Sequence, residues 1–258
     1  MRTTVGIFVT RAAAEHAVAR ALENGFSQHR ITMLSPGTAG TAESSMPRTH
    51  GEQPGVGKAV GFVVGAAVGM ATGFPLGAAM TTLLVPSVGP VIAWGLLGAA
   101  VLGVGGAAVG GAIETALTEG VPKDEVFVYE DALRQGRTVV AALAEDGAQA
   151  DAAKAVFNEA GAESIDAARE QWWVGLRSAE RERYVVAGHD FETDEPAFRR
   201  GFEAALHVDV RGRSYGEAQA ELRARYPDAY DAPAFRRGYD RGVAYRQSLE
   251  DVRRREAA

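Results

Sequence analysis

The pattern of hydrophobic and polar positions is dominated by one uncharged stretch, which runs from Ala59 to Ile113 and carries glycine at a spacing of four. Residues four apart share one face of a helix, so these glycines would form a smooth strip that another helix backbone can approach closely. Such strips are typical of helices that associate in lipid, whereas in water each glycine costs a helix about 1 kcal/mol relative to alanine. We expect helix–helix contacts at Gly57, Gly61, Gly65, Gly69, Gly73 and Gly77 in one series and at Gly95, Gly103 and Gly111 in a second.

The uncharged stretch is long enough for two helices. A break near Pro86–Pro90 would leave about 25 residues on either side, and each such helix could cross a hydrocarbon core of about 30 Å. Pro75 should kink or divide the first helix. The pattern therefore predicts a glycine-zipper helical hairpin over residues 56–117, preceded by a flexible linker over residues 41–55 that is rich in Ser, Thr, Gly and Pro.

The segments on either side of the hairpin alternate between strand and helix patterns. Together they predict an α+β domain of the ferredoxin-like type, βαβ-(α)βαβ, which is interrupted by the hairpin and comprises residues 1–40 and 118–170. The expected elements are a strand at Thr4–Thr10, a helix at Ala12–Asn24, a strand at Ile31–Ser35, a short helix after Pro122 capped at Gly136, a strand at Arg137–Ala144, a helix at Ala148–Ala160 and a strand at Glu163–Asp166.

The last part of the chain contains an internal repeat. The run DEPAFRRGF at Asp194–Phe202 recurs as DAPAFRRGY at Asp231–Tyr239, and Ser214 with Glu217 forms a capping-box pattern that opens a helix ending near Tyr226. We expect a three-helix C-terminal domain over residues 171–258. Its predicted core comprises Phe198, Phe202, Leu222, Tyr226, Phe235 and Tyr239.

Charge narrows the choice of partners. The net charge is −6, and the residues from Arg177 onward contain 16 Arg and 16 Asp plus Glu, so the whole excess lies in the first 176 residues. A nucleic-acid-binding protein should show a basic face or domain, and neither part of the chain is basic, so we expect no nucleic acid as a partner. The absence of cysteine excludes disulfides and thiolate chemistry. The short apolar run before Arg11 does not resemble a signal peptide.

Candidate catalytic, metal and cofactor motifs fail on inspection. The five histidines form no HxxxH or HExxH pattern, and His189-Asp190 is interpreted as a surface or capping pair. The glycine-rich run lacks a Walker A motif, because Ala59 follows Gly57-Lys58, and GxGxxG fails at Ala108. We therefore expect no catalytic residue, no metal, no cofactor and no enzymatic activity.

Two further clusters allow two interpretations each. Trp172-Trp173 could anchor the chain at a membrane interface, although ordinary core packing is favoured. The paired arginines could bind phosphate or lipid headgroups, whereas the favoured alternative is ion pairing with the nearby acids Glu195, Glu203, Asp231 and Asp240. The arginines concerned are Arg199, Arg200, Arg236 and Arg237.

Several of these segments resemble a known family. VGIFVTRAAAEHAVARALENGF, the interrupting glycine-rich segment and GVPKDEVFVYEDALRQGRTVVAALA resemble bacterial heat-induced and general stress proteins with an internal glycine zipper. The C-terminal FRRGF and FRRGYDRG resemble a small module of stress-associated bacterial proteins, many of which carry tryptophan where this chain has Tyr215 or Phe235. The resemblance covers roughly residues 3–168 and 184–247. It implies stress association and membrane proximity and transfers no site residue.

The leading hypothesis is a non-enzymatic, stress-linked structural protein. Its hairpin would enter a membrane or pack with hairpins of sister chains, on the cytoplasmic side of the inner membrane or in a cytoplasmic assembly. Some cover is required, because an exposed apolar patch of this size far exceeds what a soluble monomer tolerates. The alternative is a water-soluble homo-oligomer or shell with the hairpins buried between subunits. A third hypothesis is a pore, although an uncharged segment is poorly suited to a hydrated lining.

Overall fold

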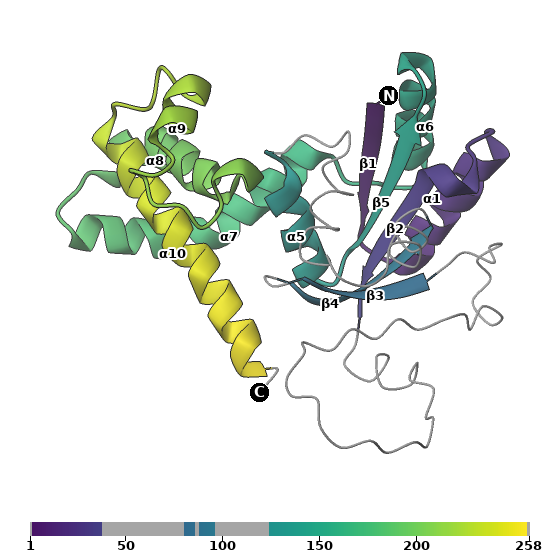
Figure 1. The fold of residues 1–258 in the computed structure, drawn as a ribbon, viewed down its shortest axis with the longest axis horizontal. Helices are drawn as coiled ribbons and strands as arrows, with labels where there is room; N and C mark the ends of the chain where they lie inside the picture. The colour runs from purple at the N-terminus through teal and green to yellow at the C-terminus, as the bar shows by residue number, and fades with distance from the viewer. Residues whose placement is uncertain (1, 38–79, 86–87, 96–123, 257–258) are drawn as a thin grey trace. The chain divides into compact units, whose positions relative to one another are not determined.

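A computed structural model describes residues 2–37, 80–85, 88–95 and 124–256 of the chain (Figure 1). The chain divides into two compact units. The first, the α+β unit, comprises Met1–Gly120 and Ala132–Glu163, and the second, the helical unit, comprises Val121–Asp131 and Ser164–Ala258. The boundary between them passes through helix α5 (Val126–Arg134), which precedes the strand that comes last in the chain.

The described strands of the α+β unit form one sheet in the order β1-β5-β2-β4-β3, with every neighbouring pair antiparallel. The strands are β1 (Arg2–Phe8), β2 (Ile31–Pro36), β3 (Met80–Val85), β4 (Gly89–Gly95) and β5 (Thr138–Ala144). The predicted strands that correspond to β1, β2 and β5 are confirmed. The predicted strand at Glu163–Asp166 is wrong beyond its first residue: Glu163 makes a single bridge to Ile7, and Ser164 then caps the next helix.

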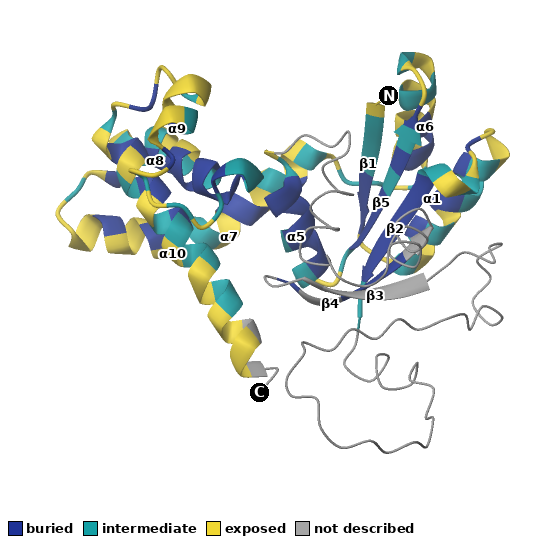
Figure 2. Ribbon diagram, viewed as in Figure 1, coloured by how far each residue is buried: buried dark blue, intermediate teal, exposed yellow. Residues whose placement is uncertain are grey.

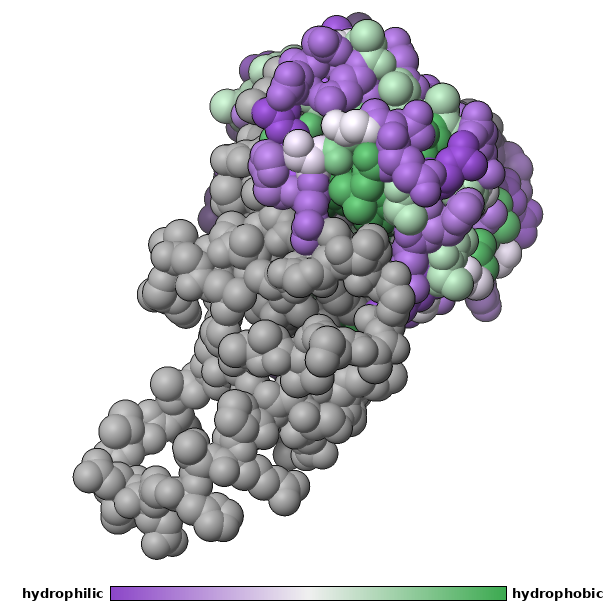
Figure 3. Space-filling model, turned by 90° about the vertical axis from the view of Figure 1, so that its right-hand side faces the viewer, coloured by the Kyte–Doolittle hydropathy of each residue, from purple (hydrophilic) through white to green (hydrophobic). Residues whose placement is uncertain are grey.

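Two helices pack on one face of this sheet, as the sequence predicts. Helix α1 (Arg11–Glu23) begins after Thr10, whose side chain accepts a hydrogen bond from the Ala13 N–H, and α6 (Gly147–Glu159) begins after Asp146, which accepts one from Gln149. Their apolar sides join alternate residues of the strands in a single buried core that includes Ala17, Val18, Met33, Val140 and Phe157 (Figure 2). Seen from the side that faces right in Figure 1, hydrophilic residues make up most of the described surface, with hydrophobic residues in more than one place among them (Figure 3).

The centre of the predicted helical hairpin is a β-hairpin. Strands β3 and β4 pair with each other, and β4 also pairs with β2, so the prediction of helix is wrong over the residues of these two strands. Gly95 ends β4 and pairs with Thr32 instead of lying on a helix face. A short apolar run can be strand or helix by periodicity alone, and the β-branched residues here favour the strand once the edge of β2 is available. The other predicted contact glycines lie outside the described residues: Gly57, Gly61, Gly65, Gly69, Gly73, Gly77, Gly103 and Gly111.

The helical unit contains α7 (Ile165–Val186), α8 (Phe191–Leu206), a 3-10 turn η2 (Val208–Val210), α9 (Gln219–Arg225) and α10 (Pro233–Glu256). The prediction of three helices is incomplete, because α7 also belongs to this unit and continues across residue 171. The predicted core is confirmed at Phe198, Phe202, Leu222, Phe235 and Tyr239, which are buried, whereas Tyr226 is half-buried. Ser214 and Glu217 exchange the predicted capping-box hydrogen bonds, but α9 itself begins only at Gln219.

Within the described ranges, no helix is both long enough and apolar enough to cross a membrane.

Candidate functional site

Helices α8 and α10 cross at two glycines that the internal repeat makes equivalent. A Cβ atom at Gly201 would lie 1.9 Å from the carbonyl oxygen of Phe235, and one at Gly238 would lie 1.9 Å from that of Phe198. Both pairs are related by the 37-residue offset that takes Asp194 to Asp231, so the crossing has a local twofold pseudo-symmetry. Only glycine permits such an approach of two backbones. Gly242, one helical turn after Gly238, extends the contact, since its Cβ would lie 2.5 Å from the Phe202 oxygen.

The preceding helices repeat as well. The run RERY at Arg181–Tyr184 recurs as RARY at Arg223–Tyr226, and the same offset of 42 residues takes Trp173 to Tyr215. The helical unit therefore consists mainly of two related halves. We call Ile165–Leu206 the first half and Val208–Glu256 the second half.

Four arginine–aromatic contacts follow the same symmetry. The Arg199 guanidinium lies 5.5 Å from the ring centroid of Trp173, and the equivalent Arg236 lies 5.3 Å from that of Tyr215. The second arginine of each pair crosses to the other half: Arg237 lies 5.3 Å from the Tyr184 ring, and Arg200 lies 5.6 Å from the Tyr226 ring. Cation–π attraction fixes the direction of all four guanidinium groups.

Arg199 and Arg237, which rest on rings of the first half, also bind carboxylates. Arg199 donates hydrogen bonds to Glu203 at 2.8 Å and to Glu170 at 2.7 Å. Arg237 donates to Asp194 at 3.2 Å and to the Tyr184 hydroxyl at 2.9 Å. These contacts favour the ion-pair interpretation for two of the four predicted arginines. Asp194, the acid bound by Arg237, is not one of the four acids that the sequence predicts as partners.

Glu195, one of the acids predicted to bind the paired arginines, binds Arg177 instead. It accepts two hydrogen bonds from Arg177, at 2.7 and 2.6 Å, and one from the indole N–H of Trp173 at 2.9 Å. The hydrogen bonds from Arg177 hold the pKa of Glu195 below its ordinary value of 4.5. Glu195 therefore remains charged under conditions in which an ordinary glutamate begins to take up a proton.

Arg200 and Arg236 rest on rings of the second half and are exposed. A third exposed arginine, Arg223, lies 4.9 Å from the ring centroid of Tyr230. Among the described residues, none of these three makes an ion pair with a carboxylate within 4.0 Å, which distinguishes them from Arg199 and Arg237. Burial and the neighbouring Tyr230 raise the pKa of Tyr215 to about 12, so this ring stays neutral at physiological pH.

The tryptophan pair lies in the interior of the unit, as the packing interpretation predicts. Trp172 and Trp173 are 3% and 1% exposed. The Trp172 ring lies 4.8 Å from that of Phe127 in α5 and 5.8 Å from that of Phe202. Asp190 caps α8 by accepting hydrogen bonds from Thr193, which confirms the capping role predicted for the His189-Asp190 pair.

Two buried carboxylates each bind two arginines. Glu180 in α7 is 2% exposed and accepts hydrogen bonds from Arg241 at 2.8 and 2.7 Å and from Arg183 at 2.8 Å. Glu130 in α5 pairs with Arg211 at 3.0 Å and with Arg246 at 3.3 Å. A buried carboxylate needs such partners, because its desolvation is otherwise very costly. These pairs join α10 to α7 and to the part of α5 that belongs to the helical unit.

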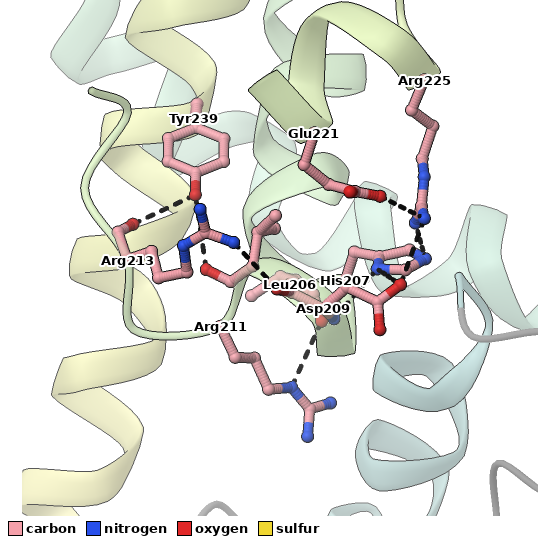
Figure 4. Close-up of polar contacts among 9 residues, drawn as sticks. Leu206, His207, Asp209, Arg211, Arg213, Glu221, Arg225 and Tyr239 are labelled. Atoms are coloured by element: carbon pink, nitrogen blue, oxygen red, sulfur yellow. Dashed lines mark hydrogen bonds and ion pairs between the residues drawn. The ribbon is translucent and has the colours of Figure 1, made fainter. Parts of the chain in front are cut away.

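Polar side chains also hold the connection after α8 (Figure 4). Arg225 contacts the ring nitrogen Nε2 of His207 and donates hydrogen bonds to Asp209 at 3.2 Å and to Glu221 at 2.7 Å. The backbone carbonyls of this connection accept hydrogen bonds from Arg211, Arg213 and Tyr239. The cluster satisfies backbone groups that no helix partner reaches, so its geometry is that of a structural connection.

No group of three His, Cys, Asp or Glu side chains within the described ranges is arranged to hold a metal ion. Comparison of the chain with protein-family models, with curated proteins and with solved structures found no match.

The close approach at the glycines of the α8–α10 crossing and the role of the third exposed arginine, Arg223, were not predicted from the sequence. A usable signal was present, since the Arg-x-Arg-Tyr runs extend the repeat to the preceding helices. It indicates which arginines are equivalent, but only the structure shows which of them have carboxylate partners.

Proposed function

We propose that this protein is a non-enzymatic, stress-linked structural protein that self-associates through its glycine-rich segments and associates with a membrane through them. One observation carries the proposal. In the register of the β3–β4 hairpin, Met80 lies opposite Trp94, so the uncharged residues 59–79 and 96–113 join the sheet at neighbouring points. Two apolar, glycine-rich segments that start side by side are suited to acting together. The hairpin uses only the central part of the uncharged stretch, and the remainder still requires cover from lipid or from other chains.

The strand order supports a ferredoxin-like assignment for the α+β unit. With the Ile7–Glu163 bridge taken as a fourth strand, the bridge, β1, β5 and β2 follow one another across the sheet, which is the order of that fold. The β3–β4 hairpin then extends the sheet beside β2. In this proposal the glycine-rich segments are insertions at one end of a regular sheet.

The stress link rests on the resemblance of the sequence to bacterial general stress proteins. A soluble homo-oligomer, with the segments buried between subunits, is the alternative to membrane association. In both models the apolar segments must be buried. The models differ in whether lipid or other copies of the chain bury them. We place the assembly on the cytoplasmic side of the inner membrane, or in the cytoplasm if no lipid is bound.

The native mass of the protein, measured without detergent and together with its phospholipid content, tests the proposal. We expect particles well above the chain mass of 27.2 kDa that carry phospholipid. A large particle free of phospholipid supports the soluble alternative, and a monomer without lipid contradicts both. Discrete single-channel conductance after reconstitution would instead favour a pore.

Substitution of a predicted contact glycine sharpens this test. Gly69→Leu adds a side chain where a neighbouring backbone should touch, and overpacking of this kind costs about 1–3 kcal/mol at each contact. We expect smaller particles at equal concentration. Gly175→Leu is the matched control, because Gly175 lies in α7 with nothing within 4 Å of its Cβ position. Undiminished assembly and thermal stability in Gly69→Leu would show that the spacing of four is not a packing device.

A further inference from the structure

Arginines at equivalent positions of the repeat differ in whether a carboxylate neutralises them. The repeat makes Arg236 equivalent to Arg199, Arg200 equivalent to Arg237, and Arg223 equivalent to Arg181. All three counterparts have a carboxylate partner, since Arg181 also binds Glu192, at 2.6 Å. Arg200, Arg223 and Arg236, whose guanidinium groups lie on rings of the second half, make no such ion pair among the described residues.

The missing partners can be traced position by position. Where the first half has Glu192 and Glu170, the second half has Ala229 and Gly212, which carry no charge. Asp194 corresponds to Asp231, which is exposed and makes no ion pair with Arg200 in the described structure. The second half has therefore lost two of these carboxylates outright.

At Asp240 an ion pair is missing although the residue is still acidic. It corresponds to Glu203, lies one turn after Arg236, and is one methylene shorter. Glu203 reaches Arg199 at 2.8 Å, whereas Asp240 forms no ion pair with Arg236. Burial raises the pKa of Asp240, and the attraction of Arg236 offsets this only in part.

The arginines left without an ion pair are nevertheless held in place. Tyr215 and Tyr230 stack on each other with centroids 5.4 Å apart and planes 16° apart, and Arg236 and Arg223 lie on these same rings. Arg200 lies on Tyr226, whose ring contacts that of Phe235. We call Arg200, Arg223 and Arg236 the exposed arginine surface. A guanidinium that is already oriented loses less conformational freedom for each hydrogen bond it forms.

We propose that the exposed arginine surface binds the carboxylates of an acidic segment of another protein chain. The arginines at the equivalent positions show what such guanidiniums bind: Asp and Glu side chains from the same helix or a neighbouring one, with N–O distances of 2.6 to 3.2 Å. An incoming acidic segment supplies the carboxylate partners that these three arginines lack. The tyrosine faces are engaged in contacts within the unit, which favours an oxyanion over a flat aromatic ligand such as a nucleic-acid base.

Binding of a fluorescein-labelled octaglutamate peptide to the full chain, followed by fluorescence anisotropy at low salt, tests this inference. We expect saturable binding that the double variant Arg223→Gln/Arg236→Gln weakens by about tenfold. The matched control Arg254→Gln/Arg255→Gln removes the same charge from exposed positions of α10, and there we expect less than about a twofold change. Circular dichroism verifies that all variants are folded.

A variant that leaves the net charge unchanged separates the loss of a specific contact from the loss of positive charge. Asp240→Glu restores the counterpart of Glu203 and should pair with Arg236, so peptide affinity should fall by about two- to threefold.

Absence of octaglutamate binding, or an equal loss in both double variants, overturns the inference. Tighter binding of inorganic phosphate or phosphatidylglycerol vesicles at these same arginines also overturns it, in favour of a phosphate ligand. The inference is independent of the proposed function, because all its residues lie in the helical unit. Native mass and lipid content should be unchanged in Arg223→Gln/Arg236→Gln.

Discussion

The two halves of the helical unit share a repeated sequence pattern and the contacts built on it, and they differ in their charge. Both contribute a glycine to the α8–α10 crossing, and both place an aromatic ring under each arginine pair. At one buried position, however, the first half has Glu180 with two arginine partners, and the second half has Leu222 in a hydrophobic cluster. Close backbone contact and ring stacking thus hold this geometry, while the ionic partners are free to diverge.

Substitutions at the glycine crossing should cause the largest loss of stability. The loss should be the same for the glycine of either half. Gly201→Ala and Gly238→Ala each place a Cβ 1.9 Å from a backbone carbonyl oxygen, which cannot move without separating the helices. We expect each variant to lower the free energy of unfolding by about 3 kcal/mol, measured by urea denaturation. Gly175→Ala, whose Cβ meets open space, should instead raise it by about 0.5–1 kcal/mol. A large loss in only one of the two crossing variants would break the proposed symmetry.

Substitution of the buried carboxylate Glu180 should give the second-largest loss of stability. Glu180→Gln removes the charge that Arg241 and Arg183 share, and breaking a fully buried pair costs about 3–5 kcal/mol. Because these arginine side chains are 34% and 60% exposed, water compensates in part, and we expect a loss of about 2 kcal/mol. Glu182→Gln, on the exposed side of the same helix, should change the free energy of unfolding by less than about 0.5 kcal/mol. Equal effects would mean that the Glu180 ion pairs do not stabilise the unit.

Equivalent arginines should differ in their contribution to stability. Arg237→Gln removes hydrogen bonds to Asp194 and to the Tyr184 hydroxyl, and we expect a loss of about 1 kcal/mol. Arg200→Gln removes a cation–π contact at an exposed position, so the change should stay within about 0.5 kcal/mol. Thermal denaturation of both variants under the same conditions makes the comparison. If Arg200→Gln cost as much as Arg237→Gln, a carboxylate partner of Arg200 would have to exist within the chain.

The smallest effect concerns acid stability. The pKa of Glu195 is lowered in the folded protein by its hydrogen bonds with Arg177. A carboxyl group of this kind contributes stability above its unfolded pKa and loses that contribution as the pH falls through the lowered folded value. Glu195→Gln should therefore cost a few tenths of a kcal/mol near pH 7 and flatten the decline of stability below about pH 4.5. The second half has Ala232 at this position. An unchanged acid profile would show that Glu195 does not contribute.

Much of the local structure could be predicted from the sequence. The strands and helices on either side of the uncharged stretch follow their periodicity, and two predicted helix ends coincide with glycines at positive φ, Gly25 at 87° and Gly136 at 84°. The repeated FRRG runs indicated related helices, and five of the six predicted core residues are buried. These features depend on residues close together in the chain, which is why the sequence was informative.

The β-hairpin and the arginine partners could not be predicted in the same way. Met80–Val85 and Gly89–Gly95 have no periodicity that separates strand from helix, and the open edge of β2 decides between them. A glycine spacing of four is equally ambiguous. At Gly238 and Gly242 it makes a close helix contact, whereas Gly95 of the second predicted series ends a strand.

By itself, the sequence determined the α+β class, the order of most elements, the uncharged stretch and the repeat, because these are properties of local pattern. Only the tertiary structure decided that β4 lies beside β2, that Gly201 and Gly238 meet backbone carbonyls, and that Arg237 has a carboxylate partner. Each of these depends on which distant segment arrives at a given place. Arg200 and Arg237 follow the same FRR pattern, and the difference between them comes from the acids that folding brings within reach of one and not the other.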